Sequence, residues 1–199
     1  MVAFIVDLPV EGFHINAQHG KMGMRATSTA ELIFNNCIIE SWRRIGAEGE
    51  AFGMTMKILD GSRIAVAAQC VGLAQAAYEA SLEYVRQRYA FGQHLSKFQS
   101  IQWVIADMAT NIDAARLLTM RAATLKDKGK EYSREASMAK LFASRVAVEV
   151  ADKAVQIHGG TGYFAPTVVE RLYRDAKLTE IYEGTSEVQR MVISKSLLE

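Results

Sequence analysis

The feature that most constrains this chain is a change of hydrophobic period near residue 50. Apolar residues before that point come in short runs, whereas after it they recur every three or four positions over long stretches. A stripe of this period forms one face of a helix and needs another apolar face to cover it. Only two prolines interrupt the chain, Pro9 and Pro166. The sequence therefore predicts a mainly α fold, an up-and-down four-helix bundle.

Three long helices are predicted from these stripes. Their inward positions are Ile64, Ala67, Ala68, Val71, Gln75, Tyr78, Leu82 and Val85; then Ile101, Val104, Ile105, Met108, Ile112, Ala115 and Ala122; then Ala139, Phe142, Ala143, Val146, Val150, Ala154 and Ile157. We expect Ser96 to cap the second helix and Ser133 the third. The glycines at 159, 160 and 162 would end the third helix, and Pro166 would begin a short fourth one.

The residues before the bundle are predicted to be β. Short apolar runs at 2–6, 13–15 and 31–39, the last around an Asn-Asn turn, are typical of strands. Strands this few cannot close a stable barrel and would leave open edges. We therefore expect two domains, part of a small β-domain at 1–48 and a helical-bundle domain at 49–199.

Composition excludes several classes of function. The net charge is +1, from 23 basic and 22 acidic residues with no long basic run, so neither nucleic acid nor an anionic membrane is an expected partner. No apolar run is long enough to insert in a membrane. Cys37 and Cys70 lie far apart and predict buried thiols rather than a disulfide, and no residues stand at metal-ligand spacing.

The strongest candidate for chemistry is Glu183. Ile181 and Tyr182 would bring apolar surface up to its carboxylate, and Gly184 would let a narrow group approach the backbone. A carboxylate in a partly dehydrated pocket is suited to act as a general base. The alternative is an exposed acid at a helix junction. A last helix would follow, capped by Thr185 or Ser186, with Val188, Met191 and Val192 inward.

Other candidates each have a plain structural alternative. Arg88 to Gly92 are expected to end the first long helix. Arg88 could bind a pyrophosphate, or its positive charge could interact with the negative end of that helix dipole. Asp60 and Arg63 could be a simple ion pair between residues one helical turn apart. Residues 160–165 fit the dinucleotide pattern GxGxxA, but a helix is expected before them where that motif needs a strand, so a helix C-cap is favoured.

Four of these features, in this order, resemble the flavin-dependent acyl-CoA dehydrogenases. They are Arg88-x-x-Phe91-Gly92 followed by Gln99; Gln156-x-x-Gly159-Gly160-x-Gly162-Tyr163; Arg174-Asp175-Ala176; and the stretch from Ile181 to Glu187. Lys21 to Arg25 and Leu59-Asp60-x-x-Arg63 extend the likeness over essentially the whole chain. The short-chain branch, with butyryl-CoA dehydrogenase, looks nearest.

The resemblance implies a role for each matching residue. Glu183 would remove the α-proton of an acyl-CoA thioester while the β-hydrogen leaves as hydride to FAD, giving a trans-2-enoyl-CoA. The positions that match contacts to the FAD of a neighbouring subunit are Arg88, Ala90, Phe91, Gln99, Gln156 and Gly160, and Gly159 is a further cofactor-binding position. Thr185 and Glu187 match contacts to the chain's own FAD, and Asp60, Arg63 and Gly184 match positions at the CoA-thioester site. Ser62 matches the position of the base in a minority of the family, and serine cannot do that work.

The resemblance also implies the setting of the reaction. We expect a short or medium acyl-CoA substrate, an electron-transferring flavoprotein as acceptor, a homodimer or homotetramer, and a place in fatty acid β-oxidation, in a bacterial cytoplasm or a mitochondrial matrix. Residues 1–48 resemble only the second half of the family's middle domain, so a part of the enzyme is expected. The alternative hypothesis is a non-catalytic helical assembly or binding subunit that cannot hold FAD alone.

Overall fold

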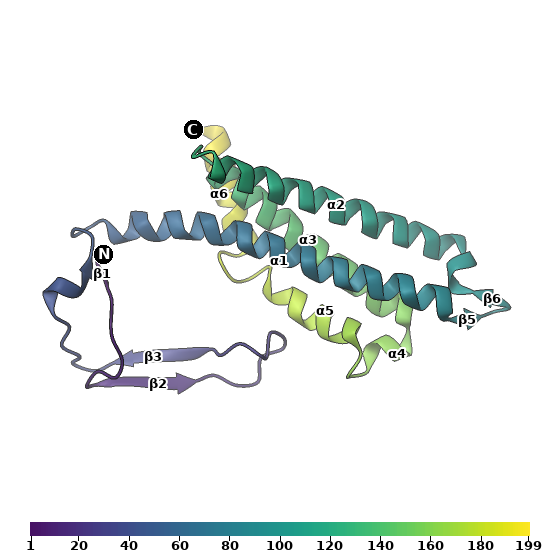
Figure 1. Ribbon diagram of the computed structural model, residues 1–199, viewed down its shortest axis with the longest axis horizontal. Coiled ribbons are helices and arrows are strands. Elements are labelled where there is room, and N and C mark those ends of the chain that lie inside the picture. The colour runs from purple at the N-terminus through teal and green to yellow at the C-terminus, as the bar shows by residue number, and fades with distance from the viewer. The chain divides into compact units, whose positions relative to one another are not determined.

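The computed structural model describes residues 1–199, which divide into two compact units, Met1–Leu59 and Asp60–Glu199. The division falls within the first long helix, α1 (Ala51–Gln87). Figure 1 shows the short strands of the first unit and the long helices of the second. All candidate site residues belong to the second unit.

The first unit contains two small antiparallel pairs of strands. β2 (Phe13–Ala17) pairs with β3 (Ala30–Phe34) from Phe13 opposite Phe34 to Ala17 opposite Ala30, and the two phenylalanine rings lie 4.9 Å apart. β1 (Ala3–Phe4) pairs with β4 (Arg44–Ile45), which follows a 3-10 turn, η1 (Ser41–Arg43). The predicted strands exist, but the first and third are shorter than expected because pairing stops at Phe4 and at Phe34.

The second unit is a helical bundle built around α3. Its other elements are a hairpin of β5 (Tyr89–Ala90) and β6 (Gln93–His94), then η2 (Leu95–Lys97), α2 (Gln99–Asp127), α3 (Ser133–His158), α4 (Gly160–Tyr163), α5 (Val168–Leu178) and α6 (Ser186–Leu198). α3 packs against α2, α5 and α6, and α1 contributes to the same core. Figure 1 shows α1, α2 and α3 running side by side along the bundle. The predicted helical-bundle fold is confirmed.

The core is made largely of small side chains. Along α1 the fully buried positions include Ala67, Cys70, Ala74 and Ala77, whose spacing of three and four residues places them on one face. The buried stripe of α2 runs from Met108 to Ala122, as the sequence predicts. On α3 the predicted alanines and valines are also buried. Alanine at these positions lets the helix axes approach closely.

Both predicted serine caps are wrong. The residue before α2 is Phe98 and the residue before α3 is Tyr132, and neither makes a side-chain cap hydrogen bond. Ser96 lies inside η2, two residues too early to cap α2, and the N–H of Ile101 in the first turn donates to Phe98 O at 3.0 Å. Ser133 is the first residue of α3, and its hydroxyl donates instead to Asp60 Oδ1 at 2.9 Å.

The end of α1 also differs from the prediction. The helix ends at Gln87, and the residues after Arg88 form the β5–β6 hairpin instead of its last turn. Phe91 and Gly92 make the two-residue turn with φ of 51° and 82°. Positive φ at both central residues is the turn type whose twist matches a two-stranded hairpin.

None of the helices combines the length and the apolar character that crossing a membrane requires. The chain also contains no group of three or more His, Cys, Asp or Glu side chains arranged to hold a metal ion.

Candidate active site

The link between α5 and α6 carries Glu183 in an unusual backbone conformation. α5 ends with a turn in which the N–H groups of Ile181 and Tyr182 donate to Leu178 O, at 2.9 and 3.2 Å. Glu183 then has φ +55° and Gly184 φ +92°. The link is closed by Ser186 N, which donates to Glu180 O at 3.1 Å. A non-glycine residue at positive φ costs about 1–3 kcal/mol, so the surrounding structure must hold it.

Two buried side chains hold this turn by its carbonyl groups. Lys140 Nζ on α3 donates to Gly184 O at 2.8 Å. Gln189 Nε2 on α6 donates to the same oxygen at 2.9 Å and to Glu183 O at 3.2 Å. Both side chains are 0% exposed. The backbone of the link is therefore fixed from two helices at once.

Thr185, one of the two residues predicted to cap the last helix, directly precedes α6. Its Oγ1 accepts a hydrogen bond from Val188 N at 3.4 Å, which makes it the N-cap. The predicted inward face of α6 is wrong, because Val188 and Met191 are exposed and the buried residue is Gln189. The amide faces inward because its hydrogen-bond acceptors are the carbonyls of the link.

The carboxylate of Glu183 is half-buried and has a partner on α1. Ser62 Oγ donates to Glu183 Oε2 at 2.5 Å. Ser62 is the position that matches the base in a minority of the family, and here it orients the carboxylate on the other element. This hydrogen bond fixes the direction in which one oxygen of Glu183 points and leaves Oε1 for another group.

Of the two residues predicted to shield the carboxylate, only Tyr182 is withdrawn from solvent. Tyr182 is half-buried, and its hydroxyl donates to the side-chain oxygen of Gln69. Burial first, and then the neighbouring Cys70 and Glu183, raise the pKa of Tyr182, so the phenol stays neutral at physiological pH. Ile181 is 52% exposed, so its expected contribution to the dehydrated wall is wrong.

Asp60 and Arg63 form more than a surface pair. Arg63 is 4% exposed and its guanidinium donates to Asp60 Oδ1 at 2.6 Å. It also reaches Ser137 on α3 at 3.5 Å, while Ser133 donates to the same aspartate oxygen. Arg63 Nε is buried and has no hydrogen-bond partner in the chain. A buried donor without a partner is a candidate contact for a ligand oxygen.

Gly184 does not leave the open approach that the sequence suggested. A Cβ at this position would lie 2.6 Å from Gln189 Nε2 and 3.4 Å from Val188 Cγ1. The missing side chain thus makes room for the amide of Gln189. A glycine is needed here for that close packing and for its φ of +92°.

Seven of the predicted cofactor-binding residues lie away from Glu183, at one end of the bundle. Arg88 and Ala90 lie at the hairpin that follows α1, while Gln156 and Gly159 lie where α3 ends; Tyr84 on α1 stacks on His158 with ring centroids 4.2 Å apart. Figure 1 shows the β5–β6 hairpin and α4 at this same end. The group is completed by Phe91, Gln99 and Gly160.

This end of the bundle presents a surface that a flat ligand could cover. Phe91 is 94% exposed, and Arg88, Gln99 and Gln156 are exposed. Nothing lies within 4 Å of a Cβ built on Gly159 or Gly160. In contrast, a Cβ on Gly162 would meet the carbonyl oxygen of Val155 at 2.8 Å, so that glycine serves packing. The GxGxxA pattern follows α3 and not a strand, which is inconsistent with a dinucleotide loop.

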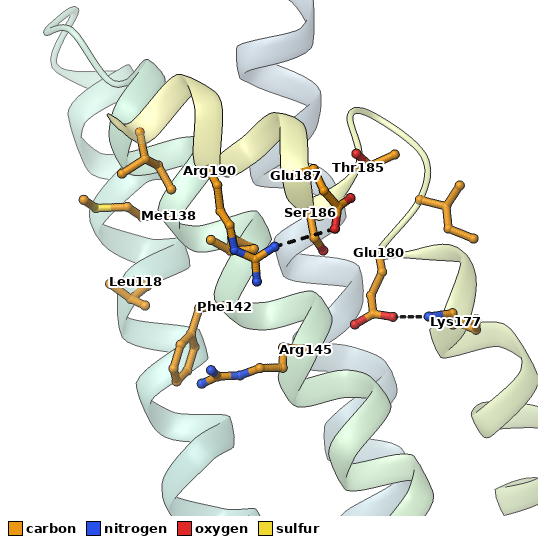
Figure 2. A pocket seen from close by; sticks show the side chains of 13 residues that line it. Leu118, Met138, Phe142, Arg145, Lys177, Glu180, Thr185, Ser186, Glu187 and Arg190 are labelled. Atoms are coloured by element: carbon orange, nitrogen blue, oxygen red, sulfur yellow. Dashed lines mark hydrogen bonds and ion pairs between the residues drawn. The ribbon is translucent and has the colours of Figure 1, made fainter. Parts of the chain in front are cut away.

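Thr185 and Glu187 line a different hollow, a cavity of about 770 Å³ between α2, α3, the end of α5 and α6. Figure 2 shows Phe142 and Arg145 on one side of it and Glu187 with Arg190 on another. Glu187 pairs with Arg190 at 3.8 Å, and Lys177 pairs with Glu180 at 2.6 Å. The cavity therefore combines apolar walls with cations whose charges are partly balanced.

Sequence patterns alone missed the roles of Lys140 and Gln189. The signal that could have found Lys140 is its position on the stripe of Ala136, Ser144 and Ala147, where every other member is small and buried. A polar side chain on such a stripe must meet a polar partner. The identity of that partner, a carbonyl more than forty residues away, follows only from the fold.

Comparison with known proteins defines the class. Residues 49–198 match the family described as Acyl-CoA dehydrogenase, C-terminal domain, which is most of the chain. The chain therefore belongs to the acyl-CoA dehydrogenase family, whose members are FAD-dependent oxidoreductases.

Individual relatives point to one branch. The chain is 47% identical over 196 residues to the short-chain specific acyl-CoA dehydrogenase, mitochondrial, of Rattus norvegicus, covering 98% of this chain and 48% of the rat protein. The butyryl-CoA dehydrogenase of Megasphaera elsdenii matches with a TM-score of 0.97 and 45% identity. A chain in the structure of the electron transferring flavoprotein of Acidaminococcus fermentans matches with a TM-score of 0.97 and 49% identity. In both structures all of this chain covers 52% of the other, so it spans about half the length of the relatives it matches.

Proposed function

We propose that this chain is the C-terminal part of an FAD-dependent acyl-CoA dehydrogenase, acting on a short or medium acyl-CoA with Glu183 as the base. The observation that carries the proposal is the construction of the turn. Glu183 is half-buried, held at positive φ by two buried donors, and oriented by Ser62. Strain of this kind is maintained at sites where the direction of one side chain matters.

The proposed role of Glu183 is to take the α-proton of the thioester. The α-carbon is a weak acid, so the base must be aimed at it and the thioester oxygen must be held as negative charge develops. The main-chain N–H of Glu183 is the donor that we assign to this oxygen. One such donor is worth about 3 kcal/mol of transition-state stabilisation. Asp60 and Arg63, which lie on either side of Ser62 in α1, would line the thioester side of the site.

The residues present fit FAD in two places. Exposed Arg88 and Phe91, with the open glycines Gly159 and Gly160, would hold the FAD of a neighbouring subunit. Ala90, Gln99 and Gln156 belong to the same surface. Thr185 and Glu187 would contact the chain's own FAD. When bound, FAD supplies the acceptor for the hydride that leaves the β-carbon. This arrangement requires at least a homodimer, and a homotetramer would satisfy it too.

The partners and setting follow from the relatives. An acyl-CoA is the substrate that the names of the rat and Megasphaera enzymes indicate, and an electron-transferring flavoprotein is the proposed electron acceptor. We place the protein in fatty acid β-oxidation, in a bacterial cytoplasm or a mitochondrial matrix.

The test is Glu183→Gln in the full-length protein that carries this chain. The substitution keeps the shape of the side chain and removes the base, so turnover should fall at least about 100-fold. Glu170→Gln is the matched control, because Glu170 is a half-buried carboxylate on α5 that pairs with Arg174. It should retain turnover. Normal turnover by Glu183→Gln would remove the mechanism.

The alternative is a non-catalytic helical assembly or binding subunit. The observation that favours it is the exposed apolar side of the β2–β3 pair, where Ile15, Leu32 and Phe34 are 60%, 56% and 50% exposed. Purified protein with a flavin spectrum that bleaches on addition of a short acyl-CoA would decide against this alternative. Colourless protein that takes up no FAD would favour it.

A further inference from the structure

Lys140 is the most deeply buried cation of the chain. It has no exposed surface, and lysine is almost never fully buried unless it is paired. Its one hydrogen bond is to a main-chain oxygen, Gly184 O, at 2.8 Å. Several charged or titratable groups surround it, namely Arg63 and Cys70 on α1 and Glu180 and Glu183 on the link. A side chain kept in this place at such a desolvation cost must be doing something that a small apolar residue could not do.

What Lys140 contacts is the turn that presents Glu183. Lys140 donates to the carbonyl oxygen of Gly184, the residue after Glu183. Gln189 Nε2 donates to the same oxygen and also to the carbonyl oxygen of Glu183. We call Lys140 and Gln189 the carbonyl clamp. The clamp takes hold of two successive carbonyls from two helices, α3 and α6. It therefore holds the backbone directly after the Cα of Glu183, at Glu183 O and at Gly184 O.

The clamp is suited to hold a strained conformation. Glu183 and Gly184 both have positive φ, whereas the other main-chain hydrogen bonds of the link are donated by Glu180, Ile181, Tyr182 and Ser186. The close approach of Gln189 to the Cα of Gly184 leaves the amide no room to move toward the link. Rotation of the peptide between Glu183 and Gly184 would withdraw Glu183 O from Gln189, and rotation of the peptide between Gly184 and Thr185 would withdraw Gly184 O from Lys140 and Gln189 together. Two buried donors would then lose their acceptor, which opposes the rotation.

We propose that Lys140, together with Gln189, is a positioning residue for proton abstraction: it fixes the Glu183–Gly184 turn so that the carboxylate is aimed at the substrate. This inference rests on the proposed function of Glu183 and adds a residue to it. Lys140 touches neither the reacting atoms nor a cofactor and acts through the main chain of the base. The nearby carboxylates of Glu180 and Glu183 stabilise the charged ammonium group of Lys140, whereas the positive charge of Arg63 destabilises it.

The experiment uses the full-length holoenzyme with Lys140→Met, which keeps the length and apolar stem of the side chain and removes the donor. Lys153→Met is the matched control, since Lys153 lies on the same helix, is exposed, and pairs only with Asp152 at 3.5 Å. The expected result is a fall in kcat of about tenfold to a hundredfold with little change in KM, because a misaimed base affects the chemical step more than binding. The control should match the wild type.

A second readout does not depend on activity. Amide hydrogen exchange measured by mass spectrometry should become at least about tenfold faster in the peptide covering 181–188 of Lys140→Met, and remain unchanged in the middle of α2. If Lys140→Met does not fold, Gln189→Met removes the other half of the clamp and should give the same local change. A folded variant of either kind with wild-type kcat and wild-type exchange in 181–188 would overturn the inference.

The outcomes separate this inference from the proposed function. If Glu183→Gln stays active, the function of Glu183 is wrong, whatever the exchange data show. If Glu183→Gln is inactive while both clamp variants turn over like the wild type, only the positioning role is wrong. Faster exchange along the whole of α3, with a lower melting temperature and normal kcat per folded molecule, would show a purely structural lysine and would also overturn the inference.

Discussion

Replacing Gly184 by alanine tests whether this glycine is required for packing against Gln189. The new methyl group would lie 2.6 Å from Gln189 Nε2, so the amide must move. Moving it breaks the bonds to Glu183 O and Gly184 O, at 3.2 and 2.9 Å. Each such bond contributes about 1 kcal/mol, and the φ of +92° costs alanine about 1–2 kcal/mol more. The free energy of unfolding should therefore fall by about 3–4 kcal/mol.

Gly92→Ala supplies the reference for the backbone part of this cost. Gly92 has φ +82°, and nothing lies within 4 Å of its Cβ position. Its replacement should cost about 1–2 kcal/mol, which is the strain alone. Urea denaturation followed by circular dichroism measures both values. The difference between the two variants is the cost of displacing Gln189.

A double-mutant cycle then checks the cause. In a Gln189→Ala background the added methyl group at Gly184 meets no amide, so Gly184→Ala should cost no more than Gly92→Ala. The coupling energy should be about 1–2 kcal/mol. Equal destabilisation by Gly184→Ala and Gly92→Ala in the wild-type background would refute the packing argument, and so would additive costs of the two changes at 184 and 189.

Two further predictions concern groups away from the link. Burial raises the pKa of the Cys70 thiol to about 11, so its neutral form stabilises the fold below the unfolded value near pH 9. That stability should be lost as the pH rises from 9 through 11, by about 2–3 kcal/mol, and Cys70→Ala should lack this dependence when unfolding is measured across the range. Phe91→Ala should leave the free energy of unfolding within about 0.5 kcal/mol of wild type, because the ring is 94% exposed, yet should weaken retention of FAD measured by flavin absorbance after dialysis.

The helices could be predicted because their information is local. The stripe on α3 from Ala139 to Ile157 repeats at helical period, and the structure buries it as expected. The glycines after His158 also end that helix, with Gly159 at φ +58°. Thr185 was predictable as a cap for the same reason, since the signal lies within four residues of it. Each of these predictions needs only neighbours in sequence.

The errors lie where a side chain is satisfied from far away. Ser133 has a capping hydroxyl, but Asp60 on α1 accepts its hydrogen bond instead, so local capping statistics fail. On α6 the apolar Met191 is 68% exposed and the polar Gln189 is buried, because the carbonyls of the link lie beneath the helix. Hydrophobic period ranks residues by their own polarity and cannot see an acceptor on another element.

The candidate site is built from the same kind of residue, a polar side chain buried on the inward face of a helix. Arg63 on α1, Lys140 on α3 and Gln189 on α6 are polar residues on inward faces, and each is nearly or fully buried. Lys140 and Gln189 make no side-chain hydrogen bond within their own helix, and each of the three costs free energy to bury. Lys140 and Gln189 contact the link directly, while the positive charge of Arg63 acts on Lys140.

Opposite charges beside Arg63 and Lys140 offset part of the cost of burying these two cations. Asp60 pairs with Arg63, and Glu180 and Glu183 act on Lys140 against the effect of burial, which lowers the pKa of that lysine. The same carboxylate that we assign as the base therefore helps to keep its own support charged. Glu183→Gln should for that reason disturb Lys140 as well as remove the base, and Lys140→Met removes a charge beside the carboxylate as well as a donor to its turn. Gln189→Met removes a donor to the same turn without a change of charge, so Glu183→Gln and Gln189→Met separate the acid–base chemistry from the geometry that presents it.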